Sequence, residues 1–188
     1  DRRQRQMCIR DRDFKDDKRA LDTVIKAHPD VFNHNIETVR SIFKTARPQG
    51  DYDRSIEVLR YVKENSNIVT KSGLMVGLGA THVDIGSADN RKTTCLSCNS
   101  ESASMYSSEL EEIEQTLVDL KNAGVDIVTI GQYIQPSKQH LPVAKYYTLE
   151  EFEELKELAR KIGFKNFQIG PLVRSSYHAM ASYETSLR

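Results

Sequence analysis

The chain has 188 residues, with 27 basic and 27 acidic side chains, so its formal net charge is zero. This balance argues against a generic surface for nucleic acid or for an anionic membrane. Hydrophobic residues make up 38% and charged residues 29%, which is typical of a soluble globular domain with a real core. No apolar run approaches the roughly 20 residues of a membrane span. The charged N-terminus does not resemble a signal peptide.

Residues 1–12 differ from the rest of the chain. They hold five Arg and two Asp without apolar periodicity, so we predict a non-native-looking charged tail outside the fold. The three cysteines, an odd number, do not make a secreted disulfide framework. A reducing compartment is therefore favoured.

Apolar spacing predicts the elements of the first half. Leu21, Val24 and Ile25 fall on one helix face, and Asp51 is placed to cap a later helix. The predicted elements are a helix over 16–28, a strand over 30–34, a short helix over 37–45, a helix over 51–65 and a strand over 68–78.

The second half is predicted by stronger patterns. Leu110, Ile113, Leu117 and Leu120 form the stripe of a helix that ends at Gly124. The segment 125–130 is nearly all apolar, as in strands buried on both faces of a parallel sheet. A helix over 150–162, ended by Gly163, and a strand over 166–169 complete the predicted elements.

Strands and helices alternate four times, which indicates an α/β protein with a parallel sheet. Four strands are too few to close a barrel, so we expect an open, curved half. Residues 80–107 interrupt this alternation with a stretch rich in Ser, Thr, Asn and Asp. Connections of this kind are usually two to six residues long, so the stretch is either functional or a disordered, non-native insertion.

A Cys-x-x-Cys pair, Cys95 and Cys98, lies in this insertion. Such a pair can be redox-active or half of a zinc site. There is no second pair, and His82 and His140 are not at zinc-finger spacing. An incidental pair is favoured, with a small metal or redox module as the alternative.

Four blocks place polar or glycine residues where strands end. They are 29–39, with His34, Asn35 and Glu37; 73–79, with three glycines; 131–141, with Gln132 and Tyr133; and 170–178, with Arg174, two Ser, Tyr and His. Strand ends carry the sites of barrel enzymes, and glycines let a ligand approach the backbone. Helix capping by Asn35, a tight strand exit, a polar loop broken by Pro136 and a disordered tail are the respective alternatives.

Together with Arg47-Pro48 and the stretch 51–55, these blocks resemble lipoyl synthases, a radical S-adenosylmethionine family, over roughly 13–79 and 108–179. The resemblance implies the C-terminal half of a radical-SAM partial (β/α)6 TIM-like barrel. It would occupy 13–179, interrupted by the disordered insertion 80–107 and followed by a tail over 180–188. One departure stands out, because Ala80 lies where the family pattern has an acidic residue.

The resemblance implies an enzyme that inserts two sulfur atoms at C6 and C8 of a protein-bound octanoyl group, which makes the lipoyl cofactor. The intact enzyme would hold two [4Fe–4S] clusters and S-adenosylmethionine. Neither cluster's cysteine motif is present here, so we expect an incomplete cluster or none, and no activity of this chain alone. The alternative is a non-catalytic truncated barrel that binds S-adenosylmethionine or a lipoyl-carrier domain.

The resemblance also assigns residues, although none is a catalytic residue in this half. The implied S-adenosylmethionine contacts are Asn35, Glu37, Arg54, Gly73, Gly77, Gly79, Gln132 and Tyr133. Ser175, or alternatively Ser176, would be an oxygen ligand of the auxiliary cluster, weaker than thiolate. Arg174 would offset the charge of that cluster, and Lys138 and His140 would contact the substrate protein or cofactor.

The implied partners are octanoylated carrier domains of 2-oxoacid dehydrogenase complexes or the glycine-cleavage H protein. A reductant such as ferredoxin or flavodoxin would supply electrons. No nucleic acid or membrane partner is expected. The bacterial cytoplasm fits this chemistry, with the mitochondrial matrix as the alternative.

Overall fold

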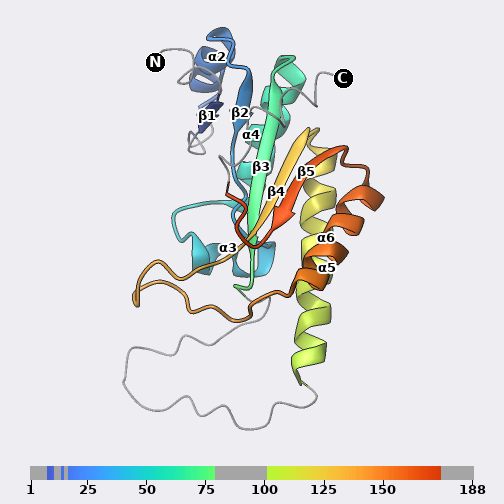
Figure 1. Cartoon of the computed structure of the whole chain (residues 1–188). Coiled ribbons are helices and arrows are strands. Elements are labelled where there is room, and N and C mark those ends of the chain that lie inside the picture. The colour runs from blue at the N-terminus through green and yellow to red at the C-terminus, as the bar shows by residue number, and fades with distance from the viewer. Residues whose placement is uncertain (1–7, 11–13, 15–16, 79–100, 175–188) are drawn as a thin grey trace.

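The computed structural model describes residues 8–10, 14, 17–78 and 101–174 (Figure 1). Five strands form one sheet in the order β1-β2-β3-β4-β5, and every neighbouring pair is parallel. The strands are β1 (Cys8–Arg10), β2 (Val31–Asn33), β3 (Val69–Val76), β4 (Ile127–Gln132) and β5 (Asn166–Gly170). The helices are α2 (Lys18–Lys26), α3 (Arg40–Ala46), α4 (Tyr52–Asn65), α5 (Glu101–Asn122) and α6 (Leu149–Ile162). The expected parallel α/β fold is confirmed.

One face of the sheet packs against the helices. Alternate strand residues share one hydrophobic core with the inner faces of α4, α5 and α6; from the strands these are Phe32, Leu74, Val76, Val128, Ile130 and Ile169. The helices contribute buried side chains such as Leu59, Leu117 and Leu155. Because successive residues of a strand point to opposite faces, the remaining strand residues lie on the other face.

The other face carries polar residues and glycines among apolar ones such as Val31 and Ile127. The strand register pairs Asn33 with Lys71, and Thr129 with both Gly73 and Gln168. These residues alternate with the core positions, so they share the face opposite the helices, which we call the polar face. Asn33 is only 2% exposed, and Lys71 and Thr129 are also buried.

The helix ends follow the predicted signals. The Asp51 side chain caps α4 by accepting a hydrogen bond from the Arg54 backbone N–H at 3.0 Å. Thr148 and Glu151 form a capping box at α6, and Gly163 ends that helix with a φ of 98°. None of the helices in these ranges is long and apolar enough to span a membrane.

The structure differs from the sequence prediction at the C-terminal end of the interrupted region and at the N-terminus. The backbone of Cys8–Arg10, predicted to lie outside the fold, forms β1 beside β2, whose edge offers free backbone groups. Helix α5 begins at Glu101, inside the predicted insertion 80–107, because the backbone of residues 101–107 continues the helix of the apolar stripe. Residues 80–100 of the predicted insertion lie outside the described residues.

The short helix after β2 begins at Arg40 rather than at residue 37. Glu37 has a φ of 71° and lies beside β3 in an isolated parallel bridge with Leu74. Its N–H donates to the Gly73 carbonyl at 2.9 Å, and its own carbonyl accepts from the Met75 N–H at 2.8 Å. Glu37 is therefore held as an extension of the sheet, and helix α3 starts only after it.

Candidate functional site

The carboxyl ends of the strands meet at one edge of the sheet because all five run parallel. In Figure 1 this edge is the lower one, where α3 and the long loop between β4 and α6 lie. The polar residues predicted at the strand ends are thereby brought to the same side of the molecule.

Asn35, Glu37 and Gly73 form the first cluster at this edge. The Asn35 side-chain amide donates to the Glu37 carboxylate at 3.4 Å. A side chain at Gly73 would begin 3.3 Å from Asn35 Oδ1 and only 2.4 Å from Thr129 Oγ1. Gly73 therefore packs directly against the side chains of Asn35 and Thr129, and a side chain there would displace Thr129.

Two acceptors in this region remain open. Asn35 Oδ1 is buried, and so is Oδ1 of Asn33, two residues earlier at the end of β2. Neither oxygen accepts a hydrogen bond from the described residues. A buried polar atom without a partner is uncommon in proteins and calls for a ligand or water. The sequence prediction included Asn35 but missed Asn33, whose signal was its position at the end of β2.

The backbone of this cluster is fixed. Arg47 donates from Nη1 to the Asn35 carbonyl at 3.3 Å, and the Ile36 N–H donates to Ser72 Oγ at 3.2 Å. These bonds hold the loop after β2 against β3. The cluster can therefore present its acceptors without rearranging the loop.

The exit of β3 forms a second cluster around Gly77. Gly77 has a φ of 89°, and a side chain there would begin 2.2 Å from the Lys145 carbonyl oxygen. Its N–H donates to the carboxylate of Glu109 at 3.1 Å, and Glu109 is only 6% exposed. The acidic residue that the sequence pattern lacks at Ala80 thus has a counterpart, which reaches the same strand exit from α5.

Gln132 and Tyr133 anchor the loop that follows them. The Gln132 amide nitrogen donates to the Lys145 carbonyl at 2.9 Å, and its oxygen accepts from the Tyr147 N–H at 2.9 Å. Tyr133 donates its hydroxyl to the Leu141 carbonyl at 2.8 Å, and burial raises the pKa of Tyr133. Their side chains thus hold this loop in place, and the structure does not bring them together with Asn35 and Glu37.

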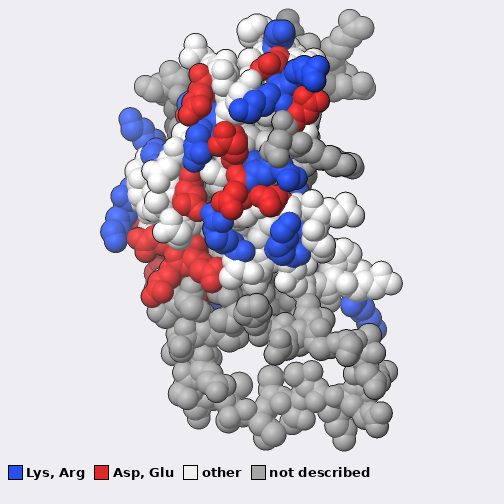
Figure 2. Space-filling model, turned by 180° about the vertical axis from the view of Figure 1, so that it is seen from behind, with Lys and Arg blue, Asp and Glu red and all other residues white. Residues whose placement is uncertain are grey.

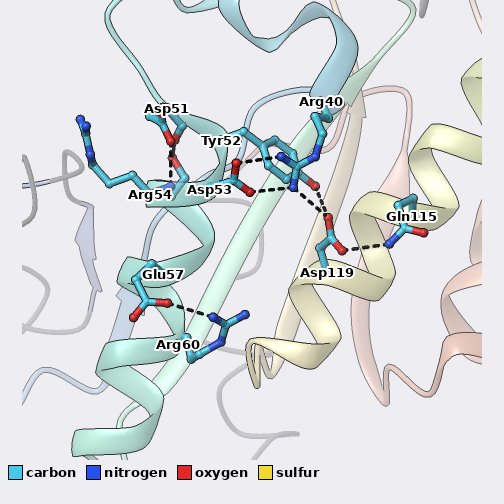
Figure 3. Close-up of polar contacts among 10 residues, drawn as sticks. Arg40, Asp51, Tyr52, Asp53, Arg54, Glu57, Arg60, Gln115 and Asp119 are labelled. Atoms are coloured by element: carbon cyan, nitrogen blue, oxygen red, sulfur yellow. Dashed lines mark hydrogen bonds and ion pairs between the residues drawn. The ribbon is translucent and has the colours of Figure 1, made fainter.

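Arg54 lies in the first turn of α4, where Figure 3 shows its side chain pointing away from a neighbouring polar cluster. In that cluster Arg40 donates two hydrogen bonds to Asp53, at 2.9 and 2.8 Å, and stacks 4.1 Å above the ring of Tyr52. Tyr52 donates to Asp119 of α5 at 2.9 Å. The hydrogen bonds from Arg40 lower the pKa of Asp53, and burial raises the pKa of Tyr52. This cluster joins α3, α4 and α5, and its role is structural.

The remaining candidates are peripheral or not described. Lys138 and His140 are exposed in the loop after β4, where His140 Nδ1 lies 2.8 Å from Ser137 Oγ. Arg174 is exposed at the end of the described chain. Gly79, Cys95, Cys98, Ser175 and Ser176 lie outside the described residues.

The parallel sheet and its helices place the chain in the class of parallel βα-barrel folds, of which it forms an open part. A solved structure of methylornithine synthase is similar with a TM-score of 0.50 at 10% identity, and the match covers 90% of this chain and 42% of that one. At this identity the likeness concerns the fold alone. No protein-family model matches the chain.

The sequence relatives are more specific. The lipoyl synthase of Rubrobacter xylanophilus is 46% identical over 177 residues, which are 94% of this chain and 46% of the relative. That of Flavobacterium psychrophilum is 45% identical over 89% of this chain and 48% of its own length. A mitochondrial lipoyl synthase of Nematostella vectensis is 42% identical over the same shares. The chain spans about half the length of the curated relatives it matches, and over that half its resemblance to the lipoyl synthase family is confirmed.

Proposed function

We propose that this chain is part of a lipoyl synthase and forms one wall of the cavity where S-adenosylmethionine and an octanoyl chain meet. The observation that carries this proposal is the 46% identity to a lipoyl synthase over 94% of the chain. The whole enzyme would insert two sulfur atoms at C6 and C8 of a protein-bound octanoyl group.

Asn35, Glu37 and Gly73 fit S-adenosylmethionine. The open Oδ1 of Asn35 and the carboxylate of Glu37 can accept hydrogen bonds from amino or hydroxyl groups. Gly73 has no side chain of its own, which leaves room beside these acceptors for the side chain of Thr129. When bound, S-adenosylmethionine supplies the means of removing hydrogen from the octanoyl chain. Arg54 is the proposed partner of the ligand carboxylate, and Gly77 and Gly79 complete the proposed surroundings. Gln132 and Tyr133 would act indirectly, by holding the loop after β4.

The described residues do not fit an iron–sulfur cluster. No group of three or more His, Cys, Asp or Glu side chains among them could hold a metal ion. Ser175, or alternatively Ser176, remains the proposed oxygen ligand of an auxiliary cluster in the whole enzyme, with Arg174 beside it to offset negative charge. The cluster cysteines would come from elsewhere, and we therefore propose that this chain alone is inactive.

The proposed partners follow from the same activity. Octanoylated carrier domains of 2-oxoacid dehydrogenase complexes or the glycine-cleavage H protein would present the substrate, and ferredoxin or flavodoxin would supply electrons. Lys138 and His140 occupy an exposed loop at the carboxyl edge, where a carrier domain would approach. The bacterial cytoplasm is the proposed location, with the mitochondrial matrix as the alternative, since both bacterial and mitochondrial relatives occur.

Calorimetric titration of the full chain with S-adenosylhomocysteine tests the binding wall. We expect binding that weakens about tenfold in Asn35→Ala, because one hydrogen bond in a buried site is lost. Asn65→Ala is the matched control, since Asn65 lies at the far end of α4 and donates only to the Tyr61 carbonyl. Absence of binding, or equal affinity of the wild type and Asn35→Ala, would contradict the proposed wall.

An activity assay tests the other half of the proposal. The chain, reconstituted with iron and sulfide and supplied with an octanoylated carrier domain, is expected to form no lipoyl product. Product formation would show that the chain is catalytic by itself. Binding without product agrees equally with the non-catalytic alternative, a truncated barrel that only holds ligand or carrier. Adding a cysteine-bearing N-terminal half of a lipoyl synthase would then separate the two readings, because only a part of an enzyme would restore product formation.

A further inference from the structure

The chain after β5 folds back over the sheet. Val173 donates its N–H to the Gly170 carbonyl at 3.2 Å, which closes a tight turn. The Val173 carbonyl oxygen then lies 2.4 Å from the point where a side chain on Gly131 would begin. Figure 1 shows this last, red part of the chain turning back across the sheet from the end of β5.

Gly131 occupies a particular place in the sheet. In register it lies between Met75 of β3 and Gly170 of β5. It has the same parity along β4 as Thr129, so a side chain here would project from the polar face. The segment 171–174 therefore crosses the polar face, opposite the helices, and does so over a residue that has no side chain.

The requirement for glycine is specific to Gly131. Real side chains essentially never come closer than 3.0 Å, so a methyl group at Gly131 would push the Val173 backbone away. At the neighbouring Gly170 a methyl group would lie 3.6 Å from Val173 Cγ2, an ordinary contact. Gly131 thus excludes a methyl group, whereas its partner Gly170 in the sheet has room for one.

We propose that Gly131 is a positioning residue that sets the path of residues 171–174 across the polar face. It thereby fixes the place of Arg174, the residue that precedes Ser175 and Ser176 in the sequence. The importance of this place rests on the proposed function, in which one of those serines is a cluster ligand. The path itself rests only on the contact between Gly131 and Val173.

Amide hydrogen exchange by NMR on the full chain, without ligand, tests this path. In the wild type the Val173 amide is expected to exchange at least tenfold more slowly than in an unfolded peptide, because it donates to Gly170. In Gly131→Ala that protection is expected to be lost, and trypsin is expected to cleave faster after Arg174. Gly170→Ala, the matched control, is expected to retain both wild-type rates.

The location of the change separates positioning from general stability. A purely structural role of Gly131 would speed exchange throughout the sheet, including Val128 in β4, whereas positioning confines the change to the segment 171–174. The proposal is overturned if the Val173 amide is unprotected in the wild type, or if its exchange is unchanged in Gly131→Ala. It is overturned as well if Gly131→Ala speeds exchange throughout the sheet, or if Gly170→Ala has an equal effect. The wild-type measurement keeps it testable if Gly131→Ala does not fold. Because no ligand is present, this result is independent of the titration with S-adenosylhomocysteine.

Discussion

The two faces of the sheet carry different kinds of residues on the same strands. Toward the helices, β3 and β4 present Leu74, Val76, Val128 and Ile130, all of them buried in one hydrophobic core. Toward the other face the same two strands present Lys71, Thr129 and two glycines, interspersed with the apolar Val69, Met75 and Ile127. The comparison shows that the hydrophobic core lies on the helix side of the sheet, and we propose that the polar face is the side that binds a ligand.

A truncation in the helix layer should have the largest effect on stability. Leu117 of α5 is fully buried, and Leu117→Ala is expected to lower the free energy of unfolding by about 2–5 kcal/mol, through lost burial and the cavity left behind. Leu149→Ala, at a residue that is 67% exposed, should change it by less than about 0.5 kcal/mol. Urea unfolding measures both, and similar losses would contradict the assignment of the core to this face.

The strand exit should show an intermediate effect. Glu109→Ala leaves the buried Gly77 N–H without its acceptor and is expected to cost about 1–3 kcal/mol in urea unfolding. Glu109→Gln keeps an acceptor oxygen and should cost less. The exposed Glu111→Ala on the same helix is the control. If all three variants matched the wild type, Glu109 would have no anchoring role.

The ion pair between Arg40 and Asp53 should have the smallest effect. The Asp53 side chain is 75% exposed, so Asp53→Asn is expected to cost only about 0.2–1 kcal/mol near pH 7, and less in high salt.

The pH dependence of this effect follows from the pKa of Asp53. Arg40 lowers it from its ordinary 3.8, so the ion pair stabilises the folded state at pH values above that. The contribution is lost as the pH falls through the lowered pKa, so wild type and Asp53→Asn should converge in acid. Urea unfolding between pH 2 and pH 7 tests this, and a difference that grows toward low pH would contradict the sign.

The sequence predicted the elements that have a local cause. The apolar run of β4, the capping residue Asp51 and the terminating Gly163 each act within a few neighbouring residues, and all were confirmed. It missed β1, which is held by backbone pairing along an edge and needs no apolar pattern. It also placed the start of α3 too early, because only the pairing with β3 holds Glu37 in its left-handed conformation.

The site was predictable to a similar extent. Asn35 and Glu37 come next to Gly73 because the chain after β2 continues to pair along β3, where Glu37 lies beside Leu74. The contacts of Gly77 with Glu109, and of Gly131 with Val173, join residues 32 and 42 positions apart, and no local pattern encodes them. The resemblance implied Gln132 as a contact of S-adenosylmethionine, whereas its side-chain amide binds the backbone of Tyr147, 15 residues further along the chain. No local pattern encodes this contact.

The most direct test of the central claim is an NMR titration of the full chain with S-adenosylhomocysteine, following backbone amide shifts. The polar face as a binding wall predicts shifts concentrated at Asn35, Glu37 and Gly73, with little change along α5 and α6. Shifts confined to the helix layer, or none at saturating ligand, would contradict the division of the sheet into a stabilising face and a binding face.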